Sequence, residues 1–259
     1  MDLTVNNQLV HIDLYHFFRR RPEHDITTKR PERRLQNQRY LFYQVIPIKE
    51  SRRDFYLLLL VIMDPIERLR KMVTAISGMS RENFDLSLNY WQPKTYKKGE
   101  FYNEYRSVCR YLGFVLTGVF RIYKFHDQSG VEKNMQFFTD DQFMTSFKSF
   151  FSQESCEYYT ESMTESDILY IHYDNLQHLY KTSQAWERFG RIFAESVLHA
   201  VMNNTEAFMF KSPEDRYAEL IRIHPHICNV VPLYHIASYL GIEGPSLSRI
   251  RRRMASKEL

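Results

Sequence analysis

Residues 232–254, PLYHIASYLGIEGPSLSRIRRRM, predict two short helices joined by a tight turn. Pro232 suits the first turn of a helix, where a missing N–H leaves no intrahelical hydrogen bond unmade. Apolar residues then recur at helical spacing. Gly241 ends this helix, because glycine tolerates the left-handed conformation of a sharp exit. Pro245 lies at the head of the next helix, so the stretch has the form of a helix-turn-helix.

The second of these helices is expected to have two unlike sides. Its apolar side consists of Leu247, Ile250 and Met254. Its polar side includes Arg249 and Arg253. Two short helices at an angle, the second apolar behind and basic in front, suit the major groove of DNA. An ordinary helical hairpin at the end of a domain is the alternative interpretation.

Length and composition bound the class of protein. The chain has 259 residues, of which 44% are hydrophobic and 25% charged, so one or two globular domains are expected rather than a disordered chain. Cys109, Cys156 and Cys228 are far apart and odd in number, which favours a reducing compartment over a disulfide framework. The longest apolar run, residues 55–63, is too short to cross a membrane.

The net charge of +4 is unevenly distributed along the chain. Residues 211–259 hold 8 Lys and Arg against 5 Asp and Glu, a balance of +3. Residues 63–210 hold 16 against 19, a balance of −3. The end with the helix-turn-helix is therefore basic, and nucleic acid is the polyanion that such an end suits. A solvated charged terminus is the alternative interpretation.

The middle of the chain predicts an antiparallel sheet. Residues 97–171 are divided into short segments rich in Tyr, Phe, Val and Ile, which is typical of a sandwich or barrel. The sequence DQSG at 127–130 predicts a hairpin turn between strands over 119–125 and 132–138. The other elements expected here are a strand over residues 167–172 and helices over residues 66–77 and 81–88.

Residues 184–210 predict one long helix, because they contain no proline, a single glycine and apolar residues three or four apart. Their apolar surface is broad enough to pack on the sheet and on a second copy of the chain. Burial within one chain alone is the alternative. Two copies would supply the two reading helices that two DNA half-sites require. The residues expected between the copies are Trp186, Phe189, Phe193, Val197 and Ala200.

This order of sheet, long helix and helix-turn-helix resembles the Crp/Fnr superfamily, the cyclic AMP receptor protein and its relatives. The resemblance covers residues 64–255, roughly three quarters of the chain. The segments that carry it are KKGEF (97–101), RYLGFVLTGVFRIY (110–123), QFFTDDQF (136–143), SPEDRYAEL (212–220) and IASYLGIEGPSLSRIRRR (236–253). The last two look most like members from Bacteroidetes-type bacteria.

The resemblance implies a fold and an assembly. The fold is α+β, with an antiparallel β-roll like that of cyclic-nucleotide-binding domains, a long dimerisation helix and a C-terminal winged helix-turn-helix. The assembly is a cytoplasmic homodimer that binds double-stranded DNA at inverted repeats, with RNA polymerase as a further candidate partner. The roll is expected over residues 63–183, the dimerisation helix over 184–210 and the DNA-binding domain over 211–259.

The resemblance also singles out residues of the reading helix. Arg249 matches the arginine by which the family's reading helix contacts the groove, so it is the first candidate for a guanine edge. Consecutive residues on a helix turn by about 100°, so Arg251, Arg252 and Arg253 cannot all face DNA. Residues at the head of the helix differ from those of better-known relatives, so the operator sequence does not transfer. The residues expected to contact DNA are Ser246, Ser248, Arg249, Arg251, Arg252 and Arg253.

The effector pocket is where the chain departs from the family. Cyclic-nucleotide binders of the family hold the ribose with a Gly-Glu pair and the phosphate with an Arg. Here Thr145 and Ser146 stand at the pair, Glu157 and Tyr158 stand near the Arg, and residues 151–179 contain no Arg or Lys. Glu157 would repel a phosphate, so we expect no tight binding of cyclic AMP or cyclic GMP. The residues expected to line a pocket for any other effector are Phe143, Thr145, Ser146, Glu157 and Tyr158.

Residues 1–62 lie outside the family pattern and carry arginine clusters at 19–21 and 30–34. A chain of this family would begin near Met63, so our favoured hypothesis is an overlong assignment of the start. A basic arm that adds contacts to DNA phosphates is the rival hypothesis.

Other classes of function find less support. The sequence has no phosphate-binding or dinucleotide glycine loop, no HExxH or GxSxG motif and no paired-cysteine metal site, so we expect no enzyme, no cofactor and no metal. The second function that we keep is a module that binds a small ligand or a partner and no longer reads DNA. The arginine cluster argues against that alternative.

Overall fold

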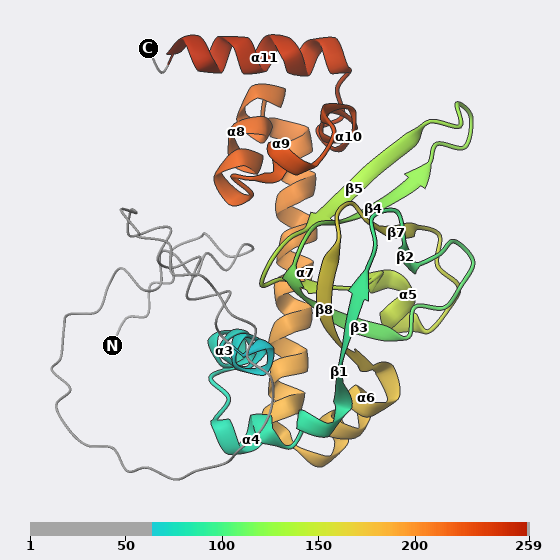
Figure 1. Cartoon of the computed structure of the whole chain (residues 1–259), viewed down its shortest axis with the longest axis vertical. Coiled ribbons are helices and arrows are strands. Elements are labelled where there is room, and N and C mark those ends of the chain that lie inside the picture. Colours follow the sequence, from blue (N-terminus) through green and yellow to red (C-terminus); the bar gives the residue numbers. More distant parts are fainter. Residues whose placement is uncertain (1–63, 258–259) are drawn as a thin grey trace, which may run out of the picture. The chain divides into compact units, whose positions relative to one another are not determined.

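The computed structural model describes residues 64–257, so the N-terminal segment 1–62 lies outside the described part of the chain. Helices and antiparallel strands form the described part (Figure 1). Two four-stranded sheets have the strand orders β1-β8-β3-β6 and β2-β7-β4-β5. The strands are β1 Trp91–Tyr96, β2 Phe101–Asn103, β3 Tyr111–Thr117, β4 Phe120–Phe125, β5 Glu132–Phe138, β6 Phe143–Met144, β7 Tyr159–Ser162 and β8 Ser166–His172.

An apolar cluster joins the two sheets into a roll. Tyr96 and Ile168 from the first sheet pack with Phe120 and Phe138 from the second, and all four are buried. The predicted hairpin is confirmed, since β4 and β5 pair in antiparallel register and Gly130 adopts the left-handed φ of +64° in the turn between them. The roll therefore has a closed aromatic interior.

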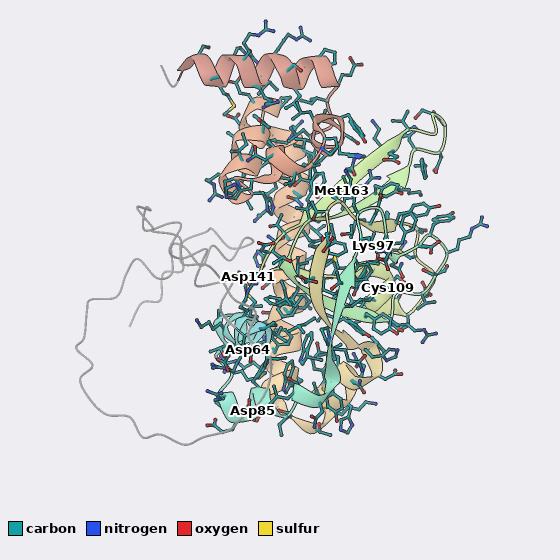
Figure 2. The ribbon with its side chains drawn as sticks, in the orientation of Figure 1. Asp64, Asp85, Lys97, Cys109, Asp141 and Met163 are labelled. Carbon is teal, nitrogen blue, oxygen red and sulfur yellow. The ribbon has the colours of Figure 1, made fainter. Side chains whose placement is uncertain are left out.

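Within the described residues, three helical elements precede the roll: α3 Pro65–Ser77, α4 Arg81–Asp85 and the 3-10 turn η2 Leu88–Tyr90. Arg68 of α3 is buried and donates a hydrogen bond to the carbonyl of Leu116 at 2.7 Å. Its guanidinium also pairs with Asp141 at 2.8 Å, on the side of the roll next to α3 (Figure 2). These bonds tie α3 to the roll.

Two helices follow the roll, α6 (Tyr173–Thr182) and α7 (Gln184–Phe210). The bounds of α7 are those that the apolar spacing predicts. The two helices approach closely at Gly190, where an added Cβ would lie 2.6 Å from the ring of Tyr180. Among residues 64–257, no helix combines the length and apolar character that crossing a bilayer requires.

The C-terminal part contains four helices: α8 Pro213–Ile223, α9 Ile227–Val230, α10 Leu233–Tyr239 and α11 Gly244–Lys257. Their core includes Leu240, Leu247 and Ile250. The expected wing is absent from the described residues, because no strand follows β8 there and α11 continues to Lys257. Residues 244–257 have helical apolar spacing, in agreement with the single helix α11, and the wing stays a prediction.

Candidate nucleic-acid interface

The helix α11 has the two unlike sides that the sequence predicts. Leu247 and Ile250 are buried against the preceding helices, and Met254 packs at the edge of the same cluster. Ser248 and Arg249 are exposed, and Arg251, Arg252 and Arg253 are exposed as well. Ser246 is half-buried at the first turn. The outer side therefore presents a cationic surface to solvent.

The turn between α10 and α11 is held by backbone bonds and one buried alanine. Gly241 adopts the left-handed φ of +68°, and the amide of Ile242 donates to the carbonyl of Ala237 at 3.0 Å. Ala237 is buried where the helices meet. Arg216 of α8 donates to the carbonyl of Leu240 at 2.8 Å, which satisfies an orphan carbonyl at the end of α10. The sharp exit at Gly241 is therefore the one that the sequence predicts.

The arginines of α11 differ in what they contact. Arg253 pairs with Glu214 of α8 at 3.0 Å. Burial raises the pKa of Tyr217 to about 12, and the charge of the neighbouring Arg251 opposes that rise. Among the described residues, Arg249 reaches only the hydroxyl of Ser246, at 3.2 Å within its own helix. The guanidinium of Arg249 is therefore less engaged with the rest of the domain than that of Arg253.

The residues expected at the Gly-Glu position lie inside the roll and are occupied by it. Thr145 is fully buried, and its hydroxyl donates to the carbonyl of Tyr111 at 2.9 Å. Ser146 is 2% exposed, and its hydroxyl lies 2.9 Å from that of Thr160. Phe143 is buried between Phe114, Phe189 and Phe193. Thr145, Ser146 and Phe143 are thus part of the core rather than an open pocket.

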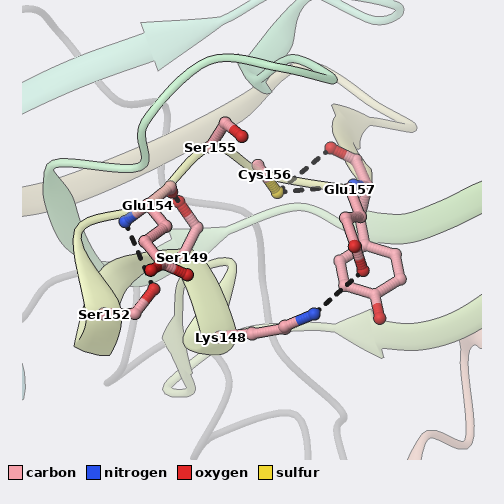
Figure 3. Close-up of a pocket in the computed structure, with 8 residues that line it drawn as sticks. Lys148, Ser149, Ser152, Glu154, Ser155, Cys156 and Glu157 are labelled. Carbon is pink, nitrogen blue, oxygen red and sulfur yellow. Dashed lines mark hydrogen bonds and ion pairs between the residues drawn. The ribbon is translucent and has the colours of Figure 1, made fainter.

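Glu157 and Tyr158 line a surface pocket of about 450 Å³ instead, beside α5 (Phe147–Ser152). Figure 3 shows Lys148 reaching Glu157 across this pocket, at 3.0 Å. That hydrogen bond lowers the pKa of Glu157. Lys148 was not predicted to lie here, because it precedes residues 151–179, the stretch that contains no Arg or Lys. Within the described residues, no group of three or more His, Cys, Asp or Glu is placed to hold a metal ion.

The structure corrects part of the expected dimer contact. Trp186 and Phe189 are fully buried, and Phe193 is 8% exposed. Trp186 packs on Phe84 of α4, and Phe193 packs on Phe143 of the roll. These side chains form the contact between α7 and its own chain, so they cannot meet a partner. Val197 and Ala200 are half-buried on the same side of the helix.

A different side of α7 is apolar and exposed. Leu198 is 60% exposed, Val201 58% and Met202 52%. Ala194 and Thr205 are also exposed, so positions 194, 198, 201 and 205 repeat at the 4-3-4 spacing of a coiled-coil seam. At about 100° per residue, this seam lies about 110° around the helix from the buried side. The seam consists of Ala194, Leu198, Val201, Met202 and Thr205.

Neither the protein-family models nor the curated proteins contain a match to this chain. Solved structures do match. FixK2 from Bradyrhizobium japonicum is 17% identical with a TM-score of 0.55, over 65% of this chain and 86% of that one. A proposed transcriptional regulator of the Crp/Fnr family from Eubacterium rectale is 19% identical with a TM-score of 0.52, over 70% and 85%. A cyclic nucleotide-binding domain from Methylobacillus flagellatus is 15% identical with a TM-score of 0.50, over 54% and 80%.

The chain has the fold of these proteins. The mixed α+β fold with an antiparallel β-roll is thereby confirmed, in agreement with the observed strand orders. One of these structures is named as a transcriptional regulator and another as a cyclic nucleotide-binding domain.

Proposed function

We propose that the chain is a homodimeric, sequence-specific DNA-binding transcription regulator of Crp/Fnr type that works in the cytoplasm. The observation that carries the proposal is the two-sided helix α11, whose buried Leu247 and Ile250 leave Arg249 and Arg252 exposed. A helix held in this way can enter the major groove with its cationic side toward the bases and phosphates. Arg249 is the first candidate for a guanine edge, and the neighbouring arginines and serines supply phosphate contacts.

The proposed dimer uses the exposed seam of α7 rather than the buried side. Leu198 and Val201 project outward one turn apart, and an exposed apolar stripe at this spacing is stabilised by burial against an identical helix. Two copies related by a twofold axis would present two α11 helices to an inverted repeat. RNA polymerase remains a candidate partner of the assembled dimer.

The proposed regulator does not bind cyclic AMP or cyclic GMP tightly. The hydroxyl groups of Thr145 and Ser146 already make hydrogen bonds inside the roll. Lys148 could attract a phosphate, but Glu157 already neutralises it at 3.0 Å. A phosphate in the surface pocket would therefore have to displace this carboxylate from its cation.

Selection from a pool of randomised DNA duplexes tests the proposal. We expect the purified chain to enrich an inverted repeat, with an affinity that falls steeply as salt concentration rises. The double variant Arg249→Ala/Arg252→Ala should lose this enrichment. Lys98→Ala removes one exposed charge from the roll and serves as the control that should retain it. Enrichment of no sequence by the dimer would contradict the proposal and favour the module that binds a ligand or partner.

A further inference from the structure

The first helix of the helix-turn-helix, α10, lies directly on strand β5 of the roll (Figure 1). The backbone amide of Asn134 donates to the Ser238 hydroxyl at 3.1 Å, and that hydroxyl donates to the carbonyl of Glu132 at 3.0 Å. The rings of Phe137 and Tyr239 meet at 5.3 Å. Strand β5 therefore offers α10 both backbone hydrogen bonds and an aromatic contact.

A buried arginine completes this contact. Arg121 of β4 is 4% exposed, and its guanidinium donates to Glu161 and to Glu132, each at 2.6 Å. The same guanidinium donates to Nδ1 of His235 in α10 at 2.8 Å. It also stacks on the ring of Tyr123 at 3.9 Å. Arg121 thus joins three strands or helices through one buried charge.

The hydrogen bond between Arg121 and His235 fixes the protonation state of the His235 imidazole. A guanidinium has only donors, so Nδ1 of His235 must accept and cannot carry a proton. The side-chain amide of Asn134 reaches the same nitrogen at 3.3 Å. A proton on Nδ1 would remove both bonds and set two cations against each other. The other charged or titratable groups that face this imidazole are Glu132 at 3.8 Å, Glu161 through Arg121, and the adjoining ring of Tyr234.

Apolar packing continues from the roll into the C-terminal core. Val119, Phe137 and Met163 of the roll belong to the same buried cluster as Ile236 and Leu240 of the C-terminal part. Met163 lies at the end of the roll that faces this part (Figure 2). The backbone between α7 and α8 consists only of Lys211 and Ser212. The ring of Phe208 near the end of α7 also packs under Arg216 of α8, so the contact on the roll and this packing together set the direction of the C-terminal helices.

Docking on the roll leaves the proposed DNA surface uncovered. On the C-terminal side the contact is made by α10 and by His224 at the end of α8, whereas Ser248, Arg249 and Arg252 of α11 remain exposed. The contact therefore does not block DNA. A fixed orientation favours binding of two half-sites, because freely swinging domains would have to be ordered on DNA at an entropic cost.

We propose that Arg121, Glu132, Asn134, His235 and Ser238 form a clasp that holds the helix-turn-helix in its DNA-binding orientation, and that protonation of His235 opens it. The proposal rests on the proposed function and adds the regulation of the same DNA-binding site. The clasp would position the reading helices without a small-molecule effector.

The direction of the proton effect follows from the contacts. Burial, followed by the charge of Arg121, lowers the pKa of His235 to about 4. The released imidazole would return to about 6.5. Because the docked state has the lower pKa, docking is strongest above pH 6.5 and weakens as the pH falls from 6.5 toward 4. The docking equilibrium constant is expected to fall about tenfold between pH 7.5 and pH 5.5.

Hydrogen exchange on the full chain without DNA tests the clasp. Protection of the amides of β5 and α10, corrected for the intrinsic pH dependence of exchange, should fall by about the same factor over that pH range. His235→Lys places a permanent cation beside Arg121 and should expose these amides at every pH. His235→Asn keeps a neutral acceptor, so its protection should not change with pH. The same pH dependence in His235→Asn as in the wild type would overturn the proton step.

Measurements of DNA affinity then test whether the clasp affects DNA binding. At pH 7.5, His235→Lys should bind the duplex selected by the wild type at least tenfold more weakly, whereas His235→Asn should bind it like the wild type. Loss of protection in His235→Lys with unchanged DNA affinity would overturn the role of the clasp. If the wild type selects no duplex, the proposed function and this consequence fail together. The hydrogen-exchange experiment still decides separately whether protonation of His235 opens the contact. If His235→Lys fails to fold, the pH series on the wild type decides this.

Discussion

Individual arginines of α11 have unequal surroundings, and this predicts unequal effects on DNA recognition. In the described part of the chain Arg249 bonds only within its own helix, whereas Arg253 is held by Glu214. Arg249→Ala is expected to cost about 1–3 kcal/mol of binding free energy and to blur the sequence preference at one base pair. Competition titrations with single-base variants of the selected duplex measure this effect. Arg253→Ala should weaken all sequences alike and by less, and an equally uniform loss in Arg249→Ala would mean that Arg249 holds only phosphate.

At Gly190, the space available on its side of α7 affects stability more than the helix propensity of the residue does. Alanine gains about 1 kcal/mol over glycine in an exposed helix interior. Here the added Cβ would lie 2.6 Å from the ring of Tyr180, and such overpacking costs about 1–3 kcal/mol. Gly190→Ala should therefore lower the free energy of unfolding measured in urea. Gly244→Ala is the matched control, because nothing lies within 4 Å of its Cβ position and its φ is not left-handed, so it should be neutral or stabilising.

Predictions about single residues were confirmed where the neighbouring residues in the sequence determine the conformation. Gly241 needed only its own backbone conformation and its place between two apolar repeats. The pair between Lys148 and Glu157 was not predicted, because Lys148 lies in α5 and Glu157 in the loop that follows, and their approach depends on how that loop folds. The same holds for Arg121 and His235, which lie 114 positions apart and meet only when α10 packs on the roll.

At the scale of elements, the sequence predicted the helix α7 but not which of its sides packs on the chain's own core. Its apolar residues surround much of the helix, so spacing alone selects no face. The aromatic side chains of Trp186 and Phe189 fill the contact with the chain's own core. Smaller apolar residues such as Val201 remain exposed on another side. The side that packs on the core is decided by the volume available beneath the helix. The spacing of apolar residues does not encode this volume.

The exposed seam predicts which residues stabilise the proposed dimer. Leu198→Glu/Val201→Glu places two charges in the middle of the seam, where burial of an unpaired carboxylate is costly. This variant should sediment as a folded monomer and lose the affinity for an inverted repeat. The control is His199→Glu, which adds a charge to an exposed neighbouring position outside the seam and should leave the dimer intact. A dimeric double variant with unchanged mass in solution would rule out this seam.

At the scale of the whole described chain, the order of roll, long helix and helix-turn-helix follows from the sequence, but the contact between the roll and the C-terminal helices does not. Phe137 and Met163 belong to strand-rich segments, yet they are buried with Ile236. Their spacing cannot show this, because an inward residue of a strand and one that meets a neighbouring helix have the same period of two. The expected boundary at residue 211 therefore separates segments that share one buried cluster.

The filled roll predicts how the whole molecule responds to cyclic nucleotides. A ligand that bound the folded chain with a Kd of about 10 µM would stabilise it by about 2.7 kcal/mol at 1 mM. For a chain of this size that corresponds to a rise in Tm of roughly 5–10 °C. Because Thr145 and Ser146 are buried and bonded within the roll, we expect cyclic AMP and cyclic GMP at 1 mM to leave the Tm unchanged. Thermal unfolding with and without each nucleotide, with adenosine as the control for non-specific effects, measures this. A rise with cyclic AMP but not with adenosine would contradict this expectation and show that the folded chain binds the nucleotide through its phosphate.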